Sequence, residues 1–116
     1  MQPFFSVIIP LYNKEKYISK TLETVLNQSF QDFEVIVIND GSTDNSKAIV
    51  ENYDDSRISI FSKENKGLSH TKNYGIQQAN GTYMAFLDAD DLWNDRYLET
   101  CFSQIESGCC DSRRAG

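Results

Sequence analysis

Three carboxylates follow an apolar run in the segment YMAFLDADDLW at residues 83–93: Asp88, Asp90 and Asp91. A run of this length is typical of a buried strand, so we expect the carboxylates at its carboxyl end. Asp40 ends a second such run, FEVIVIND at 33–40. Carboxylates held together repel each other, by about 4 kcal/mol per pair at ~4 Å and an effective dielectric constant near 20. Protonation or a bound cation would relieve this repulsion.

The Asp-x-Asp motif at Asp88 and Asp90 indicates a hard divalent cation. An oxygen-only ligand set without His or Cys suits Mg²⁺ or Mn²⁺. One Asp-x-Asp supplies too few ligands for a closed cage, and Mg²⁺ usually keeps waters and takes phosphate oxygens as further ligands. We therefore interpret the motif as half of a site, whose other half is an anionic ligand such as a diphosphate.

The elements that must position these residues alternate between strand and helix. Strands are predicted at 4–10, 33–40, 57–62 and 82–88. A helix capped by Asn13 should follow the first strand, and further helices should follow the others, the last at 95–107. This alternation predicts an α/β fold, a Rossmann-like and mostly parallel sheet with helices on both faces. Ligands bind such sheets beyond the carboxyl ends of the strands, where the strand order reverses.

Bulk properties exclude several classes. The 116 residues fit one domain, and the net charge of −6 argues against a nucleic-acid partner. The N-terminus lacks the charged region of a signal peptide, and no apolar stretch approaches the roughly 18 residues of a membrane span. Three cysteines, two of them adjacent at Cys109 and Cys110, do not suggest a disulfide framework. These features predict a cytoplasmic protein.

Four segments resemble the successive motifs of the family-2 glycosyltransferases, enzymes of the GT-A fold: SVIIPLYNKEKYI, FEVIVINDGSTDNS, NKGLSHTKNYGI and GTYMAFLDADD. The resemblance implies a nucleotide pocket and a metal site. Its residues would be Pro10, Tyr12 and Glu15 around the nucleoside, Asp40 on the base, Asp88 near the ribose, Lys72 on the nucleotide and Asp90 on the metal. Lys72 stands where the family usually has arginine, so the charge is kept but the bidentate fork is lost.

The resemblance also implies an activity. A UDP-sugar would donate its sugar, with inversion and with Mn²⁺ or Mg²⁺, to a sugar, lipid or polysaccharide acceptor in cell-wall or polysaccharide biosynthesis. The family's catalytic base comes later in the chain, so we expect residues 1–107 to be a truncated, inactive donor-binding half and 108–116 an irregular tail. The protein is expected to be cytoplasmic or peripheral to the inner face of the membrane, and a homo-oligomer is conceivable. A non-catalytic nucleotide-binding module is the alternative.

Simpler interpretations stay open at this point. Asp40-Gly41-Ser42 could form only a turn and helix cap, and the 88–91 cluster could cap a helix. Residues 88–99 imitate a calcium loop, although Trp93 stands where the sharp turn requires glycine. Tyr12, His70 and Lys72 could be plain surface residues. A receiver module would need acids after the first strand, and the glycine motifs of dehydrogenases and P-loop enzymes are missing.

Overall fold

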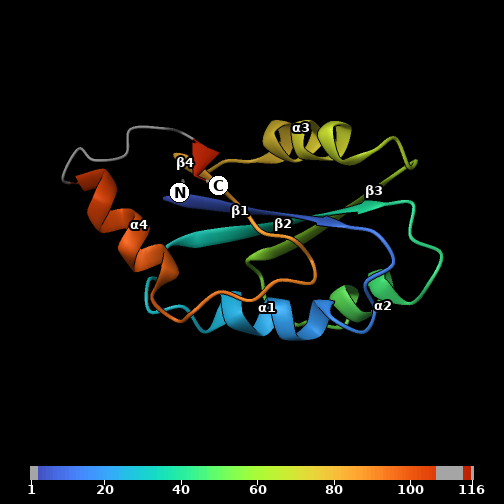
Figure 1. Ribbon diagram of the computed structural model, residues 1–116, viewed down its shortest axis with the longest axis horizontal. Helices are drawn as coiled ribbons and strands as arrows, with labels where there is room; N and C mark the ends of the chain where they lie inside the picture. Colours follow the sequence, from blue (N-terminus) through green and yellow to red (C-terminus); the bar gives the residue numbers. More distant parts are fainter. Residues whose placement is uncertain (1–2, 107–113, 116) are drawn as a thin grey trace.

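A parallel sheet forms the centre of the computed structural model, which describes residues 3–106 and 114–115. Within these residues the sheet has five strands in the order β3-β2-β1-β4-β5, and each pair of neighbours is parallel (Figure 1). The strands are β1 (Phe5–Leu11), β2 (Phe33–Asp40), β3 (Ile58–Lys63), β4 (Tyr83–Phe86) and β5 (Arg114–Ala115). The predicted α/β fold is confirmed.

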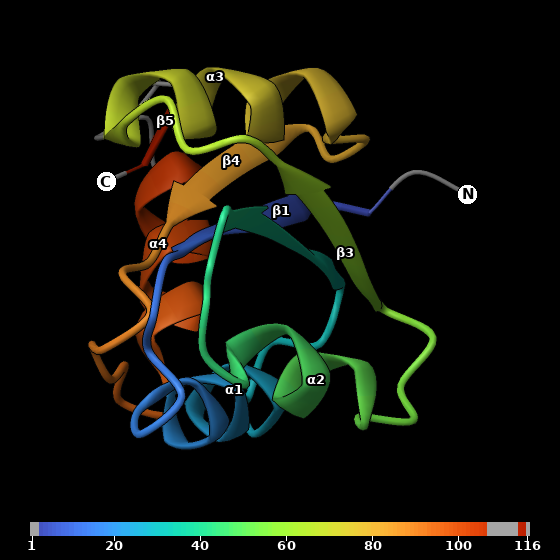
Figure 2. The same ribbon diagram turned by 90° about the vertical axis from the view of Figure 1, so that its right-hand side faces the viewer.

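Helices cover both faces of the sheet. They are α1 (Ile18–Leu26), α2 (Ser46–Glu51), α3 (Leu68–Gln78) and α4 (Tyr97–Glu106). Helix α3 lies on one face, and α1 and α2 lie on the other (Figures 1 and 2). Helix α4 joins the second layer, because its Leu98 belongs to the same buried cluster as Leu22 of α1.

The alternation of β1 builds two cores. Phe5, Val7, Ile9 and Leu11 point into the larger core, which α1, α2 and α4 close. Ile8 points the other way, toward α3, in a smaller core with Ile36 and Ile38 of β2. Side chains on opposite sides of a strand alternate, so this central strand is buried on both faces.

Two local predictions need correction or qualification. Asn13 does not cap α1: the N-cap is Tyr17, without a side-chain hydrogen bond, whereas Asn13 adopts φ 50° and its Oδ1 accepts the N–H of Thr43 at 2.8 Å. The side chain of Asn13 therefore joins the loop after β1 to the loop after β2. Of the expected irregular tail, residues 108–113 and 116 lie outside the described residues, and Arg114–Ala115 pair with β4 as a short strand.

The strand order defines a switch point between β1 and β4. The chain moves outward from β1 through β2 to β3, then returns to place β4 on the other side of β1. The loops that leave β1 and β4 diverge there, so a crevice is expected at their carboxyl ends. Among the described residues, no helix is both long and apolar enough to cross a bilayer.

Candidate ligand pocket at the strand ends

A cavity of about 470 Å³ lies at the carboxyl ends of β1 and β2, at the switch point. The loop after β4 and the beginning of α3 complete its wall. It is lined by Pro10, Leu11, Tyr12, Lys14, Asp40, Asn65, Gly67, Leu68, Thr71, Asp88, Ala89 and Asp90. Five of the seven residues proposed from the sequence are therefore brought together: Pro10, Tyr12, Asp40, Asp88 and Asp90.

Tyr12 gives the cavity an exposed aromatic ring. It follows the last residue of β1, and 45% of its surface is exposed although it lines the cavity. The loop that carries it is fixed by hydrogen bonds to the loop after β2 and to the first residue of α2: Asn13 N–H donates to Ser42 Oγ at 3.0 Å and Lys14 N–H to Ser46 Oγ at 2.8 Å. An exposed aromatic ring on a loop held in place by hydrogen bonds can stack against a planar ligand.

Asp40 is a buried carboxylate in the wall of the cavity. Its Oδ1 accepts the Nζ–H of Lys63 at 2.5 Å and the backbone N–H of Lys66 at 3.2 Å. Burial raises the pKa of Asp40, but the hydrogen bonds from Lys63 and from the backbone N–H of Lys66, with the charge of Lys63, outweigh burial and hold this pKa below its ordinary value. Asp40 is thus an ionised acceptor inside the pocket.

Asp90 is paired with Lys14 across the mouth of the cavity. Lys14 Nζ lies 3.3 Å from Asp90 Oδ2, and the two side chains are 38% and 45% exposed. Within the described residues no three His, Cys, Asp or Glu side chains gather as metal ligands, so the expected four-carboxylate cluster is not formed. The oxygen-only donor set still fits a hard cation held by Asp90 and completed by the oxygens of a ligand.

Lys72 and Asp91 line a neighbouring cavity of about 460 Å³, which shares Asp88 with the first. The Nζ of Lys72 lies 5.3 Å from the ring centroid of Phe86, and the stacked rings of Trp93 and Tyr97 form part of the same wall. A ligand that contacts both Tyr12 and Lys72 would have to span the two cavities past Asp88.

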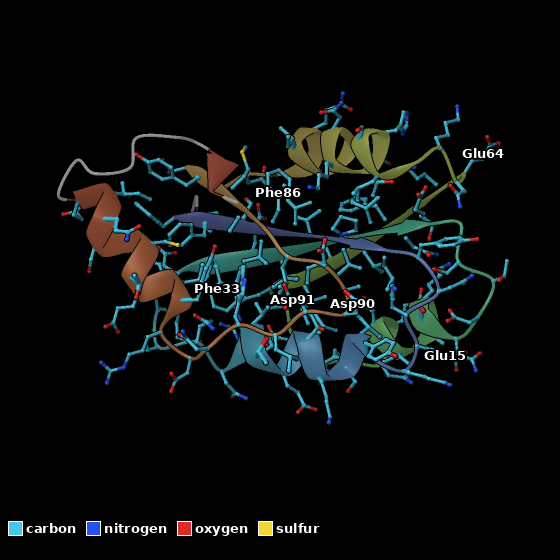
Figure 3. All side chains as sticks on the ribbon, in the orientation of Figure 1. Glu15, Phe33, Glu64, Phe86, Asp90 and Asp91 are labelled. Carbon is cyan, nitrogen blue, oxygen red and sulfur yellow. The ribbon has the colours of Figure 1, made fainter. Side chains whose placement is uncertain are left out.

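Glu15 is not among the residues that line the first cavity. It is exposed, its N–H donates to Asp44 Oδ2 at 3.2 Å, and Figure 3 shows it apart from Asp90. Its expected contact with a nucleoside stays a prediction that this geometry does not support.

The acidic residues do not take the helix-cap roles that the simpler interpretations gave them, although Gly41 does adopt φ 73° in the turn after β2. Helix α4 begins only at Tyr97, so the 88–91 cluster caps no helix. Glu99, the last ligand of a calcium loop, instead accepts the Ser29 hydroxyl at 2.8 Å. Asp40 does not cap α2, whose N-cap is Asn45, and it accepts instead from Lys63 and from the N–H of Lys66.

Two cationic residues of the site lie outside the sequence motifs. Lys14 reaches the cavity and Asp90 only through the folded conformation of the loop after β1. Lys63 is the register partner of Asp40 across β2 and β3. A correct alignment of the two strands would have revealed Lys63, because facing residues of parallel strands lie side by side.

The sequence matches the profile of Glycosyl transferase family 2 over residues 6–114. Among curated relatives, TuaG of Bacillus subtilis, named for teichuronic acid biosynthesis, is 41% identical over 101 residues that cover 84% of this chain and 40% of TuaG. The crystal structure of Staphylococcus aureus TarS 1-349 in complex with UDP-GlcNAc superposes with a TM-score of 0.84 at 36% identity, over 90% of this chain and 31% of that one.

A second solved structure contains a metal. The mannosyltransferase PcManGT from Pyrobaculum calidifontis, in complex with GDP-Man and Mn²⁺, has a TM-score of 0.73 at 29% identity, over 80% of this chain and 29% of that one. The chain thus spans less than half the length of the curated relatives and solved structures that it matches.

Proposed function

Because this chain belongs to glycosyl transferase family 2, we propose that it forms the donor-binding part of a glycosyltransferase that uses a UDP-sugar. The observation that carries this proposal is one cavity at the switch point, which unites Tyr12, Asp40, Asp88 and Asp90 from the carboxyl ends of β1, β2 and β4. The complex of the similar TarS with UDP-GlcNAc supports the choice of a uridine nucleotide.

The surroundings of each of these side chains are compatible with a specific contact to the donor. The exposed ring of Tyr12 stacks on the base, and the buried, ionised Asp40 accepts a hydrogen bond from it. Asp88 and Asp90 follow β4 on the other side of the switch point, where the ribose and the diphosphate come to lie. Lys72 reaches the part of the donor that enters the neighbouring cavity.

Asp90 would hold the divalent cation, Mn²⁺ or Mg²⁺, together with the phosphate oxygens of the donor. A metal in this position supplies a Lewis acid that stabilises the charge on the departing diphosphate. Lys14, which pairs with Asp90 at 3.3 Å in this structure, would then be available as a second positive charge near the phosphates. The Mn²⁺ in the PcManGT complex supports a metal in this family.

The acceptor hydroxyl attacks the anomeric carbon with inversion, and a carboxylate base outside the donor site takes its proton. The base and the acceptor site are expected in the part of the relatives that this chain does not span. The relation to TuaG supports an acceptor in polysaccharide biosynthesis. With such an acceptor, the protein would be peripheral to the inner face of the membrane.

Isothermal titration calorimetry tests the proposal. UDP, GDP and TDP are each titrated into the chain with Mn²⁺ and again with EDTA, and adenosine diphosphate serves as the control ligand. We expect UDP to bind most tightly, and more tightly with Mn²⁺. If no nucleoside diphosphate binds under either condition, the assignment of the cavity to a donor is wrong.

A further inference from the structure

Asp40 and Lys63 form a buried ion pair in the wall of the donor cavity. They are register partners at the ends of β2 and β3, and their side chains are 9% and 8% exposed. Asp40 lines the cavity of about 470 Å³, whereas Lys63 lines a different cavity of about 270 Å³ beside His70 and Tyr74. Lys63 therefore reaches Asp40 from behind the wall.

The two oxygens of the Asp40 carboxylate have different surroundings. Lys63 Nζ and the backbone N–H of Lys66 both donate to Oδ1. Thr71 also lies by this carboxylate, but its hydroxyl proton is given to the carbonyl of Gly67 at 2.9 Å. With Oδ1 occupied by two donors, Oδ2 is the oxygen that can accept from a ligand in the cavity.

The charge of Asp40 depends on the same contact. The charged groups that share its cavity are Lys14 from the loop after β1 and Asp88 and Asp90 from the loop after β4, and Lys63 approaches from β3. Burial favours the protonated form of Asp40, while Lys63 and the N–H of Lys66 favour the ionised form. Lys63 is the one full positive charge in hydrogen-bond contact with Asp40 among the described residues.

We propose that Lys63 is a positioning residue that makes Asp40 a fixed, pure acceptor and so selects bases that carry a ring imide N–H, such as uracil, over cytosine. This inference rests on the proposed donor function of the cavity. Uracil presents N3–H to an acceptor, whereas cytosine presents a lone pair at N3. A buried carboxylate facing that lone pair leaves two acceptors opposed and unpaired, which a hydrogen-bonding site rejects strongly.

The test compares UDP-glucose with CDP-glucose, which carry the same sugar and diphosphate, by calorimetry in Mn²⁺ between about pH 8 and about pH 5.5. Neither diphosphate diester titrates in this range. The unaltered chain should prefer UDP-glucose by about tenfold or more at every pH, because Asp40 stays ionised throughout. Lys63→Met should bind UDP-glucose normally only at the upper end of the range.

The expected pH effect has a defined sign. In Lys63→Met the N–H of Lys66 stays but the charge of Lys63 is lost, so we expect burial to raise the pKa of Asp40 and Asp40 to take up a proton as the pH falls. A protonated Asp40 can donate to N3 of cytosine, so the preference of Lys63→Met for UDP-glucose should shrink to less than about threefold near pH 5.5. A merely structural role of Lys63 would weaken both ligands equally and leave this ratio unchanged at every pH, which would overturn the proposal.

Two further variants control the experiment. Lys66→Met removes an exposed side chain but keeps the backbone N–H that Asp40 uses, so its base preference and pH profile should equal those of the unaltered chain. Lys63→Arg keeps the charge and should restore a preference that does not change with pH. If Lys63→Met does not fold by circular dichroism, the unaltered chain still decides: equal affinity for the two donors, or a preference lost by about pH 5.5, contradicts the proposal. Failure of the donor function itself looks different, because neither ligand would bind at all.

Discussion

Lys14 Nζ lies 3.3 Å from Asp90 Oδ2, so the carboxylate proposed to hold the metal is paired with an ammonium group of the same chain. Both side chains are more than a third exposed. Solvent weakens such a pair to about 0–1 kcal/mol. A divalent cation that also gains phosphate oxygens can therefore displace Lys14 from Asp90 at small cost.

The variant Asp90→Asn keeps the shape of the side chain and removes the charge that attracts the cation. We expect the gain in UDP affinity on adding Mn²⁺ to fall from about tenfold or more to less than about twofold, because each tenfold corresponds to about 1.4 kcal/mol of lost attraction. Calorimetry with and without Mn²⁺ measures the gain. Asp54→Asn, an exposed acid in the loop before β3, is the control and should keep it. An unchanged Mn²⁺ effect in Asp90→Asn would assign the metal to another residue.

The variant Lys14→Met should separate the two roles of Lys14. In EDTA it should weaken UDP binding several-fold, because the ammonium is then a positive charge left for the diphosphate. Without nucleotide it should strengthen Mn²⁺ binding, because the competitor of the metal is gone. Titrations of UDP and of Mn²⁺ measure the two effects. Lys16→Met, two residues along the same loop and exposed, should change neither affinity. If Lys14→Met and Lys16→Met had the same affinities for UDP and for Mn²⁺, a direct role for Lys14 would be refuted.

The variant Tyr12→Ala should weaken UDP binding by about 1–3 kcal/mol, the usual value of one base stacked on an aromatic ring. Tyr12 is 45% exposed, so stability should change little. Tyr17→Ala is a matched control, since Tyr17 is 52% exposed on the same loop but does not line the cavity. Equal affinities of the two variants in calorimetry, with both folded by circular dichroism, would remove Tyr12 from the site.

The fold could be predicted because its signals are local and repeated. The runs at 4–10 and 33–40 are apolar and rich in β-branched residues, which only a strand buried on both faces explains well. The sheet then brings Tyr12, Asp40 and Asp90 to one edge by topology alone. These residues lie together because the carboxyl ends of parallel strands share an edge, which no detail of side-chain packing can alter.

The partners of these residues could not be predicted in the same way. Asn13 has the composition of a helix cap, but a contact thirty residues away along the chain, with Thr43, decides its role. The contacts of Lys14 with Asp90 and of Lys63 with Asp40 follow from the conformation of the loop after β1 and from the register of β2 and β3. Such pairs depend on long-range geometry, whereas a motif records only neighbours in sequence.

The variant Gly81→Ala should destabilise the fold from the edge of the sheet opposite the donor cavity. An added Cβ at Gly81 would lie 2.6 Å from Ser6 Oγ, 2.7 Å from Ser6 N and 2.8 Å from the carbonyl carbon of Phe5. Two of these atoms belong to the backbone of central strand β1, which cannot move aside. Ser6 Oγ is also held in place, because it accepts the N–H of Gly81 at 2.7 Å and donates to Glu34 Oε2 at 2.6 Å.

Overpacking of this kind costs about 1–3 kcal/mol of unfolding free energy. Urea denaturation followed by circular dichroism measures it, with Gln77→Ala on the exposed face of α3 as the control within about 0.5 kcal/mol of the unaltered chain. The folded fraction of Gly81→Ala should bind UDP normally, and a variant as stable as the control would show that β1 and the loop before β4 are less closely packed than this geometry indicates.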